Sequence, residues 1–413
     1  MKSYLDFLRS NRSLIAFGFL LSFASSFGQT FFISLFGGEI RARLELGNED
    51  YGYIYSAATL SSAALLPFVG RGIDRFPLRG YTAFVCVGLA VGCLLLGTAS
   101  SVPMLFAAFL SLRLFGQGLM GHTSATSMAR LFANDRGRAI SLASLGFPIG
   151  EATLPALIVF LVGWTAWTHV WFGIAVGLAL VLLPLQAWLA RESVLAARRT
   201  AAVEIAPTTE SASRTTNAAR DWTTSELLRD PRFYLVVPAV LAPPFVGTGV
   251  FFHSERICGL RGWPDGYWAA AMTVYAVTSV TAALRTGPWV DQWSGRRSIP
   301  YFLIPMIGAL IALAAIPHVS GLFLYMIGAG ISAGAAGPIT GALWAERYGT
   351  RHLGSIRSLI YGIMVFATAC APGPLGGWLD RGVPVSTLAL AGAVGCAIAS
   401  VAAAIARHRD LVP

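Results

Sequence analysis

The sequence is poor in charge, in lysine and in closely spaced cysteines. Charged residues make up 12% of its 413 positions, against about 25% in soluble globular domains. Lys2 is the only lysine, so the G-x-x-x-x-G-K-[ST] loop that cradles ATP phosphates is absent and direct ATP drive is excluded. The five cysteines form no C-x-x-C pair, and no nucleophile with a neighbouring base stands out. We therefore expect no enzyme, no metal and no cofactor.

The chain is rich in long apolar runs. Hydrophobic residues make up 55% of it and the mean hydropathy is +0.64. A run of about 20 apolar residues crosses a bilayer as a helix, because all backbone groups must be satisfied within the segment. About twelve runs of this kind are predicted, at residues 13–36, 51–70, 81–98, 103–128, 139–162, 167–190, 233–254, 266–289, 298–317, 321–344, 353–376 and 384–406. The chain is thus predicted to be an all-α membrane protein.

A polar stretch divides these runs into two sets of six. It is rich in Ala, Thr, Ser, Glu and Arg, which is typical of a linker. We expect an N-terminal six-helix bundle over residues 1–190, a linker over 191–231 and a C-terminal six-helix bundle over 232–413. The end of the linker, residues 223–231, is predicted to form a short interfacial helix with Thr224 or Ser225 as its N-cap.

The net charge of +10 does not indicate a nucleic-acid partner. Most of the arginines fall in the two termini, the linker and every second loop, which is the positive-inside pattern. This pattern predicts an inner or plasma membrane protein with both termini in the cytoplasm.

Related loop sequences recur in the two halves. Between the second and third runs the chain reads Gly70-Arg-Gly-Ile-Asp74-Arg75-Phe-Pro-Leu-Arg79, and between the eighth and ninth it reads Gly287-Pro-Trp-Val-Asp291-Gln-Trp-Ser-Gly-Arg296-Arg297. Both are G-x-x-x-D followed by arginines. Two six-helix halves with the same loop chemistry predict two pseudo-symmetric bundles of a transporter.

These loops resemble the G-x-x-x-D-R-x-G-R-R signature of the major facilitator superfamily, with Pro77 in place of a glycine. The resemblance covers essentially the whole chain. It implies a secondary transporter that moves a small-molecule substrate across the lipid bilayer by alternating access, usually as a monomer. It also implies that Gly70, Asp74, Arg75, Arg79, Gly287, Asp291, Arg296 and Arg297 form cytoplasmic gating loops. The proton is the expected coupling ion.

Polar side chains within the spans indicate a candidate site. Arg113 in the fourth run is like the family's arginine motif there, and Glu151 follows Gly146-Phe-Pro-Ile-Gly150, which resembles the kink motif of proton-driven exporters. At 1.5 Å per residue, Arg113 lies about 25 Å and Glu151 about 20 Å from their arginine-rich ends, and Gln29 lies at a similar depth. Intramembrane charges are costly and face a cavity or each other. We expect Arg113, Glu151, Gln29 and Gln117 to form the polar floor of a cavity, with Arg113 and Glu151 either functional or a structural ion pair.

Two further residues complete the candidate site, and the substrate stays open between two classes. His122 is a titratable group about 12 Å from the cytoplasmic end, and Tyr275 lies at mid-depth in the eighth run. The first run, around Gln29, is similar to that of monocarboxylate and oxalate/formate carriers, which slightly favours a small organic anion or metabolite. Glu151 and its kink motif support the alternative, proton-coupled efflux of apolar or cationic compounds. A receptor or membrane-bound enzyme on the same scaffold is the remaining, disfavoured class.

Overall fold

A computed structural model describes residues 4–132, 136–191, 221–349 and 352–408. Within these residues the regular structure is helical throughout, which confirms the all-α prediction. The chain forms two compact units: unit 1 comprises Met1–Glu45 and Ala57–Arg214, and unit 2 comprises Leu46–Ser56 and Thr215–Pro413. The predicted boundaries at residues 190 and 232 stay predictions.

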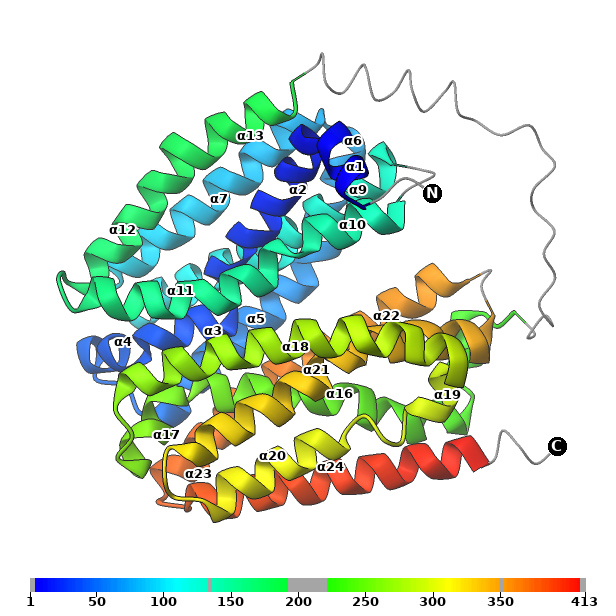
Figure 1. Ribbon diagram of the computed structural model, residues 1–413. Coiled ribbons are helices and arrows are strands. Elements are labelled where there is room, and N and C mark those ends of the chain that lie inside the picture. Colours follow the sequence, from blue (N-terminus) through cyan, green and yellow to red (C-terminus); the bar gives the residue numbers. More distant parts are fainter. Residues whose placement is uncertain (1–3, 133–135, 192–220, 350–351, 409–413) are drawn as a thin grey trace, which may run out of the picture. The chain divides into compact units, whose positions relative to one another are not determined.

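Unit 1 holds the helices that come before the linker. They are α1 (Tyr4–Ser10), α2 (Arg12–Ala24), η1 (Ser25–Gly28), α3 (Thr30–Ile33), η2 (Ser34–Phe36), α4 (Gly37–Leu44), the greater part of α5 (Asn48–Gly70), α6 (Gly72–Arg75), α7 (Leu78–Thr98), α8 (Val102–Ser111), η3 (Leu112–Met120), α9 (Gly121–Leu131), α10 (Arg136–Ser144), α11 (Gly146–Val162), α12 (Trp167–Gly177), η4 (Leu178–Leu182) and α13 (Leu183–Leu189). In Figure 1, α7 runs alongside α12 and α13, with which it is in contact.

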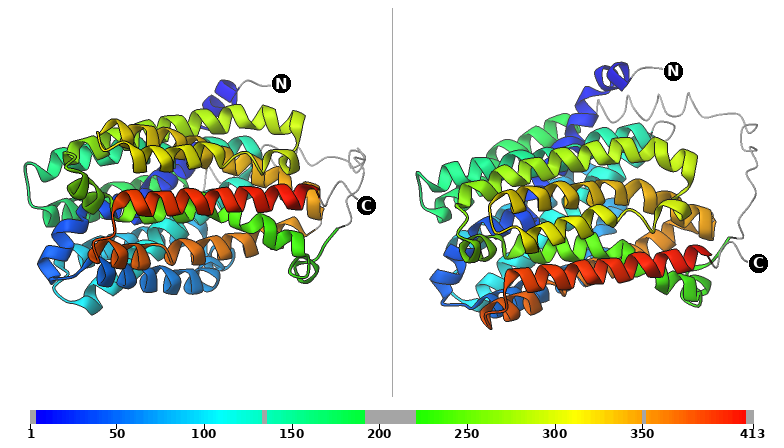
Figure 2. Two further views of the ribbon diagram at one scale, coloured as in Figure 1. Left: turned by 90° about the horizontal axis from the view of Figure 1, so that it is seen from below. Right: turned by 60° about the horizontal axis from the view of Figure 1, so that its bottom comes forward.

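Unit 2 holds the helices that follow the linker, together with the first residues of α5. They are α15 (Thr224–Leu227), α16 (Pro231–Phe252), α17 (Ser254–Arg261), α18 (Asp265–Trp293), α19 (Gly295–Ser298), α20 (Ile304–Ala315), α21 (Ser320–Tyr348), α22 (Leu353–Ala369), α23 (Pro372–Asp380) and α24 (Val385–His408). Both views in Figure 2 show α20 between α21 and α24, and α20 contacts both.

The predicted spans are helical, but two differ from the expected form. Ten helices in the described residues are long and apolar enough to cross a membrane. The first span, expected to be one helix over 13–36, is instead a pair, Arg12–Gly28 and Thr30–Leu44, bent by 50°. The ninth, expected over 298–317, is reduced to the 12 residues of α20, because residues 299–303 form turns.

Aromatic packing fills the core of unit 1. Trp171 is fully buried and lies edge-on to Phe32, with ring centroids 5.4 Å apart, while Phe36 lies 5.1 Å from the same indole. Such aromatic pairs add about 0.5–1.5 kcal/mol beyond burial alone. They tie the α3–η2 part of the first span to α12.

Glycine lets two long helices of unit 2 approach closely. A Cβ on Gly334 of α21 would lie 2.0 Å from the Ser279 carbonyl oxygen of α18, and one on Gly330 would lie 2.1 Å from Thr278 Oγ1. Apolar side chains gain little by leaving lipid for a helix interface, so membrane helices associate through close backbone packing of this kind. The α18–α21 contact therefore depends on small residues.

We predict that Gly334→Ala lowers the thermal unfolding temperature of the purified protein, because the methyl group forces α18 and α21 apart at a cost of about 1–3 kcal/mol. Gly337→Ala is the matched control on the same helix, since a Cβ there has no heavy atom within 4 Å. Equal unfolding temperatures for the two variants would show that the close contact does not contribute to stability.

Candidate functional site

The break in the first span is the starting point of the site. At Gln29 the backbone is extended, with φ −86° and ψ 154°, between the 3₁₀ turn η1 and α3. The surrounding serines bond to the backbone: Ser25 Oγ donates to Ser22 O at 2.6 Å and Ser34 Oγ to Phe31 O at 3.0 Å. Hydroxyls that bond the preceding turn weaken a regular helix. The run Ser25-Ser26-Phe-Gly28-Gln29 therefore interrupts the helix inside the span.

Arg113 satisfies a carbonyl that this break leaves open. Its side chain is 2% exposed, and Nη1 donates to Gly28 O at 3.2 Å and to Thr30 Oγ1 at 3.5 Å. Gly28 O falls at the break, where the continuous helical ladder stops, and an unsatisfied carbonyl in hydrocarbon costs several kcal/mol. Arg113 thus fastens the fourth span to both sides of the break.

The fourth span is itself irregular at this point. Leu112–Met120, which includes Arg113 and Gln117, forms a π-helix, a conformation that is frequent at functional sites. A Cβ on Gly28 would lie 2.1 Å from Leu112 O and 2.7 Å from the Gly116 Cα. The backbones of η1 and η3 are therefore in direct contact, and the half-buried Gln117 lies at this contact.

Glu151 approaches the same turn from the fifth span. Its side chain is 6% exposed, on α11, whose first turns pack tightly against the first span. A Cβ on Gly146 would lie 2.2 Å from Phe19 O, and one on Gly150 2.3 Å from Ser26 Oγ. Ser26 Oγ is buried and makes no hydrogen bond within the described part of the chain. The glycines thus pack the turn of α11 that precedes Glu151 against a buried, unsatisfied hydroxyl.

Four of the predicted site residues are therefore gathered around η1: Gln29 at its end, Arg113 and Gln117 on η3, and Glu151 on α11. The hydrogen bonds of Arg113 described here go to the first span. No ion pair between Arg113 and Glu151 is found among the described residues. Their role in binding stays a prediction.

The other two predicted residues lie elsewhere. His122 on α9 is exposed, and its Nε2 lies 3.6 Å from the position of a Cβ on Gly70, so it belongs with the loop between α5 and α7. Tyr275 is half-buried on α18 of unit 2, with its ring edge-on to Phe251 at 5.2 Å.

The first predicted gating loop is the turn α6 with its flanking residues. Arg130 Nη1 donates to Ile73 O at 3.3 Å, and the Tyr81 hydroxyl donates to Val69 O at 3.2 Å. These bonds hold the first part of the loop, at Val69 and Ile73, against α9 and α7. Arg75 and Arg79 are exposed, whereas the side chain of Asp74 lies outside the described residues.

The second predicted gating loop is held by an acid that the sequence analysis did not select. Glu346 on α21 accepts hydrogen bonds from the backbone N–H groups of Gly295, at 2.9 Å, and Arg296, at 3.1 Å. The Arg296 guanidinium in turn donates to Glu346 O. This carboxylate completes the N-terminus of α19, where negative charge is favoured. Arg297 is exposed, a Cβ on Gly287 of α18 would have no heavy atom within 4 Å, and the Asp291 side chain is outside the described residues.

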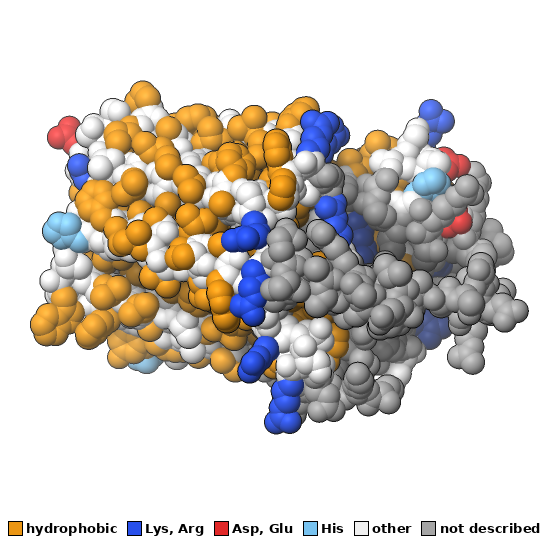
Figure 3. Space-filling view, turned by 90° about the horizontal axis from the view of Figure 1, so that it is seen from above, with side chains coloured by type: hydrophobic (Ala, Val, Ile, Leu, Met, Phe, Trp, Pro, Cys, Tyr) orange, Lys and Arg blue, Asp and Glu red, His pale blue; other side chains and the backbone are white. Residues whose placement is uncertain are grey.

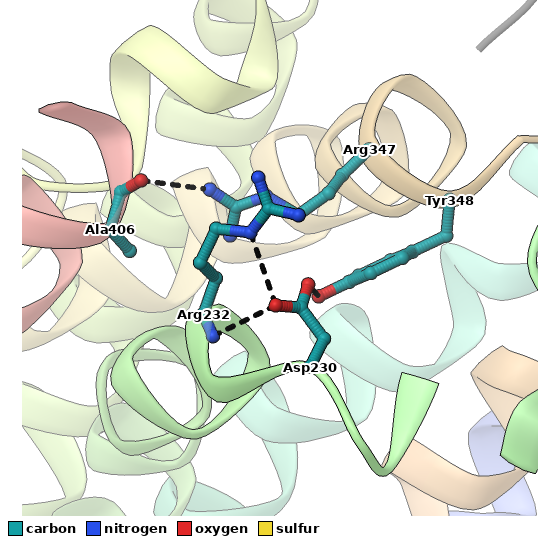
Figure 4. A network of polar contacts seen from close by, with 5 residues as sticks. All are labelled: Asp230, Arg232, Arg347, Tyr348 and Ala406. Carbon is teal, nitrogen blue, oxygen red and sulfur yellow. Dashed lines mark hydrogen bonds and ion pairs between the residues drawn. The ribbon is translucent and has the colours of Figure 1, made fainter. Parts of the chain in front are cut away.

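A buried polar cluster lies where the linker enters unit 2 (Figure 4). Asp230 is 3% exposed and caps α16 by accepting from Arg232 N, at 3.0 Å, while its carboxylate also pairs with Arg232 Nε at 3.1 Å. The Tyr348 hydroxyl donates to its other oxygen at 3.1 Å. Next to this cluster Arg347 Nη2 donates to Ala406 O, at the end of α24.

The short helix α15 precedes this cluster with a different cap from the one expected. Thr223, rather than Thr224 or Ser225, is the N-cap, and it forms a capping box with Glu226. The sequence signal was present, because Thr223 and Glu226 have the [ST]-x-x-[DE] spacing. Trp222 N also donates to Tyr348 O at 2.9 Å. The end of the linker is thereby attached to α21.

Unit 2 contains a second polar cluster around the first residues of α5. Asn48 Nδ2 donates to Asp380 Oδ1 at 2.5 Å, Glu49 N donates to Asp380 Oδ2 at 2.9 Å, and Glu49 pairs with Arg381 at 3.4 Å. Beside them Tyr51 stacks on Phe252 at 4.8 Å. Within unit 2, these contacts attach the first residues of α5 to α16 and α23.

The surface has the character of a membrane protein. Figure 3 shows a face largely covered by hydrophobic side chains, with arginine side chains along one border of the apolar area. Exposed large hydrophobic residues in unit 1 include Phe160, at 61%, and Leu180, at 72%. An apolar area this extensive is suited to lipid, and its basic border to a membrane interface.

Comparison with known proteins places this architecture in one class, that of polytopic membrane transporters. A profile of the Major Facilitator Superfamily matches residues 18–372. The chain belongs to the major facilitator superfamily. No curated protein matches the sequence.

Solved structures of transporters share the fold at low sequence identity. The nucleoside transporter NupG is 15% identical, with a TM-score of 0.68, over 95% of this chain and 98% of that chain. A bacterial homologue of the human lysosomal transporter Spinster, in an inward-facing and unoccupied conformation, is 15% identical, with a TM-score of 0.70, over 100% of this chain and 98% of that chain. The protein is thus a multi-pass membrane transporter rather than an enzyme, and it works on a small-molecule substrate within the lipid bilayer.

We predict that Asp230→Ala lowers the free energy of unfolding by about 2 kcal/mol or more. The variant loses an N-cap worth about 1 kcal/mol and leaves the buried Tyr348 hydroxyl without its acceptor, at about 1–3 kcal/mol. Thermal unfolding in detergent measures the change. Asp50→Ala, at an exposed position in α5, should change the unfolding temperature little. Equal effects of the two substitutions would contradict a stabilising role for the cluster.

Proposed function

We propose that this protein is a proton-coupled secondary transporter and that Glu151 carries the proton. The observation that supports this most is the position of the carboxyl group. Of the acidic side chains that the structure describes, Glu151 and Asp230 are the buried ones, and Asp230 is paired with Arg232 at the end of α16. Glu151 instead lies within a span, and an ionisable residue inside a membrane is functional by default.

The surroundings of Glu151 are suited to reversible protonation. Glu151 follows Gly150, which packs closely against the Ser26 hydroxyl, and this hydroxyl has no hydrogen-bond partner in the described residues. Buried polar groups are rarely left unsatisfied, so the turn is suited to a polar solute. Arg113 bonds to the other side of the turn. A proton gained or lost at Glu151 changes the charge beside a broken helix, where the backbone has more freedom to rearrange than in a continuous span.

For the substrate we favour a small organic anion or metabolite over an apolar or cationic compound. Arg113 places a permanent positive charge at the break, beside Gly28 O and Thr30 Oγ1. Proton-coupled efflux remains the second candidate. Gly146 and Gly150, in the sequence that resembles the kink motif of proton-driven exporters, are both in tight contact with the first span. NupG is a nucleoside transporter by name, and a polar metabolite of that size fits the first candidate.

The membrane placement follows from charge. We propose that the protein lies in the inner or plasma membrane with both termini in the cytoplasm, since the arginine-rich loops fall on the side of the termini. We also propose that it acts as a monomer, because each transport pathway in this fold lies within one chain.

Proton flux into liposomes tests the proposal. With the purified protein and an internal pH dye, we expect carboxylates or other small metabolites to start a proton flux, and Glu151→Gln to abolish it by removing the proton site. The Glu151→Gln variant should still exchange labelled substrate without a pH gradient, because its fold and binding surface remain. Glu45→Gln, an exposed acid in the loop before α5, is the control.

Three outcomes would change the conclusion. Full pH-driven flux in Glu151→Gln would exclude Glu151 as the carrier. Flux with lipophilic cations alone would replace the anion or metabolite by the efflux candidate. Substrate exchange without any proton movement in the natural protein would leave a transporter that is not proton-coupled.

A further inference from the structure

A hollow at the arginine-rich end of unit 1 is separate from the candidate transport site. It has a volume of about 520 Å³, within the range of about 300–1,000 Å³ that is typical of ligand pockets. The end of α5, the turn α6 and the first turns of α7 form it. Four of its lining residues are aromatic: Phe68, Phe76, Tyr81 and Phe84.

The walls of this hollow are apolar and face outward. Phe68 is 72% exposed, Phe76 63% and Phe84 50%. Pro77 and Val69 add further apolar surface, and Tyr81 directs its hydroxyl to Val69 O. Aromatic surface that is open at the end of a span meets the boundary between lipid chains and headgroups. A fully hydrophilic solute would lose its hydrogen bonds here.

The rim of the hollow is basic. Arg75 is part of the lining, while Arg71 and Arg79 immediately precede the lining residues Gly72 and Gly80, and all three arginines are exposed. Asp74 is the acid in this segment, so three positive charges and one negative charge leave a net +2 over residues 70–80. Arginine is a good partner for phosphate because its guanidinium matches the geometry of the oxygens.

An apolar hollow with a basic rim at a membrane interface matches one kind of ligand, an amphiphile with an anionic head. We propose that residues 68–84 bind an anionic phospholipid from the leaflet on the arginine-rich side. One acyl chain lies against Phe68, Phe76 and Phe84, and the phosphate bonds to Arg75. Basic pockets beside spans on the cytoplasmic side bind anionic headgroups in this manner. The inference does not depend on the substrate or on proton coupling.

Two glycines allow the proposed contact with the acyl chain to be tested without disturbing the fold. Gly80 lines the hollow, and a Cβ on it has no heavy atom within 4 Å, so Gly80→Leu fills the hollow from an open position. Gly173→Leu on α12 is the matched control, since a Cβ there is equally free of neighbours and Gly173 is exposed on another span of the same unit. Arg75→Gln tests the headgroup contact, with the exposed Arg191→Gln as its control.

Native mass spectrometry of the detergent-purified protein, titrated with phosphatidylglycerol, phosphatidylethanolamine or phosphatidylcholine, measures the binding. We expect phosphatidylglycerol to bind several-fold more tightly than either zwitterionic lipid. Arg75→Gln should weaken it about fivefold, which corresponds to about 1 kcal/mol for one basic residue at an anionic surface. Gly80→Leu should weaken it by a similar factor, and the two controls should stay within about twofold of the natural protein.

Equal retention of the three lipids would overturn the anionic specificity. Unchanged binding in both Gly80→Leu and Arg75→Gln would overturn the location. Displacement of the lipid by inorganic phosphate alone would show that the rim is a phosphate site with no part for the acyl chain. Unfolding temperatures of all four variants show whether any of them has lost its fold, and Gly80→Leu remains decisive if Arg75→Gln is unstable.

Discussion

The absence of water in the bilayer core is the constraint on which the rest of this structure depends. A helix can be interrupted there only where other groups satisfy the freed backbone. The first span is interrupted at Gln29, and the Arg113 guanidinium bonds to Gly28 O and Thr30 Oγ1 on either side of the interruption. The π-helical part of the fourth span and the glycine-rich start of α11 both pack against this turn. The need to satisfy the Gly28 carbonyl at the break thus accounts for the buried charge of Arg113, and the irregular fourth span and the close glycine contacts occur at the same turn.

The same principle appears at the arginine-rich ends of the helices. Glu346 completes the start of α19, Asp230 caps α16, and Arg347 bonds to the last turns of α24. Each of these charged side chains lies at the helix terminus where the helix dipole favours its sign. The second predicted gating loop is thereby held by a few polar bonds, and such bonds exchange for water at small net cost.

Much of the fold was predictable from the sequence, because bilayer thickness and backbone satisfaction leave few alternatives to a helix of about 20 apolar residues. Helical rise converts residue number into distance, so the sequence alone predicts similar depths for Arg113, Glu151 and Gln29, and these depths stay a prediction. The bend at Gln29 was not predictable, because hydropathy does not detect a break that polar neighbours compensate. The direct contact of Arg113 with the first span was also missed. The rise per residue along a helix predicts the depth of a side chain, but it does not predict the direction in which the side chain points. Glu346 was missed because its partners are backbone N–H groups, which leave no charge pattern in the sequence.

The central claim is that Glu151 gains and loses a proton inside the membrane. Attenuated total reflection infrared spectroscopy of the protein in lipid, with a pH step and no substrate, observes the protonated carboxyl stretch directly. We expect a difference band in the natural protein that disappears in Glu151→Gln and shifts in Glu151→Asp. Identical difference spectra for the natural protein and Glu151→Gln would contradict it, because the carboxyl would then keep one protonation state throughout.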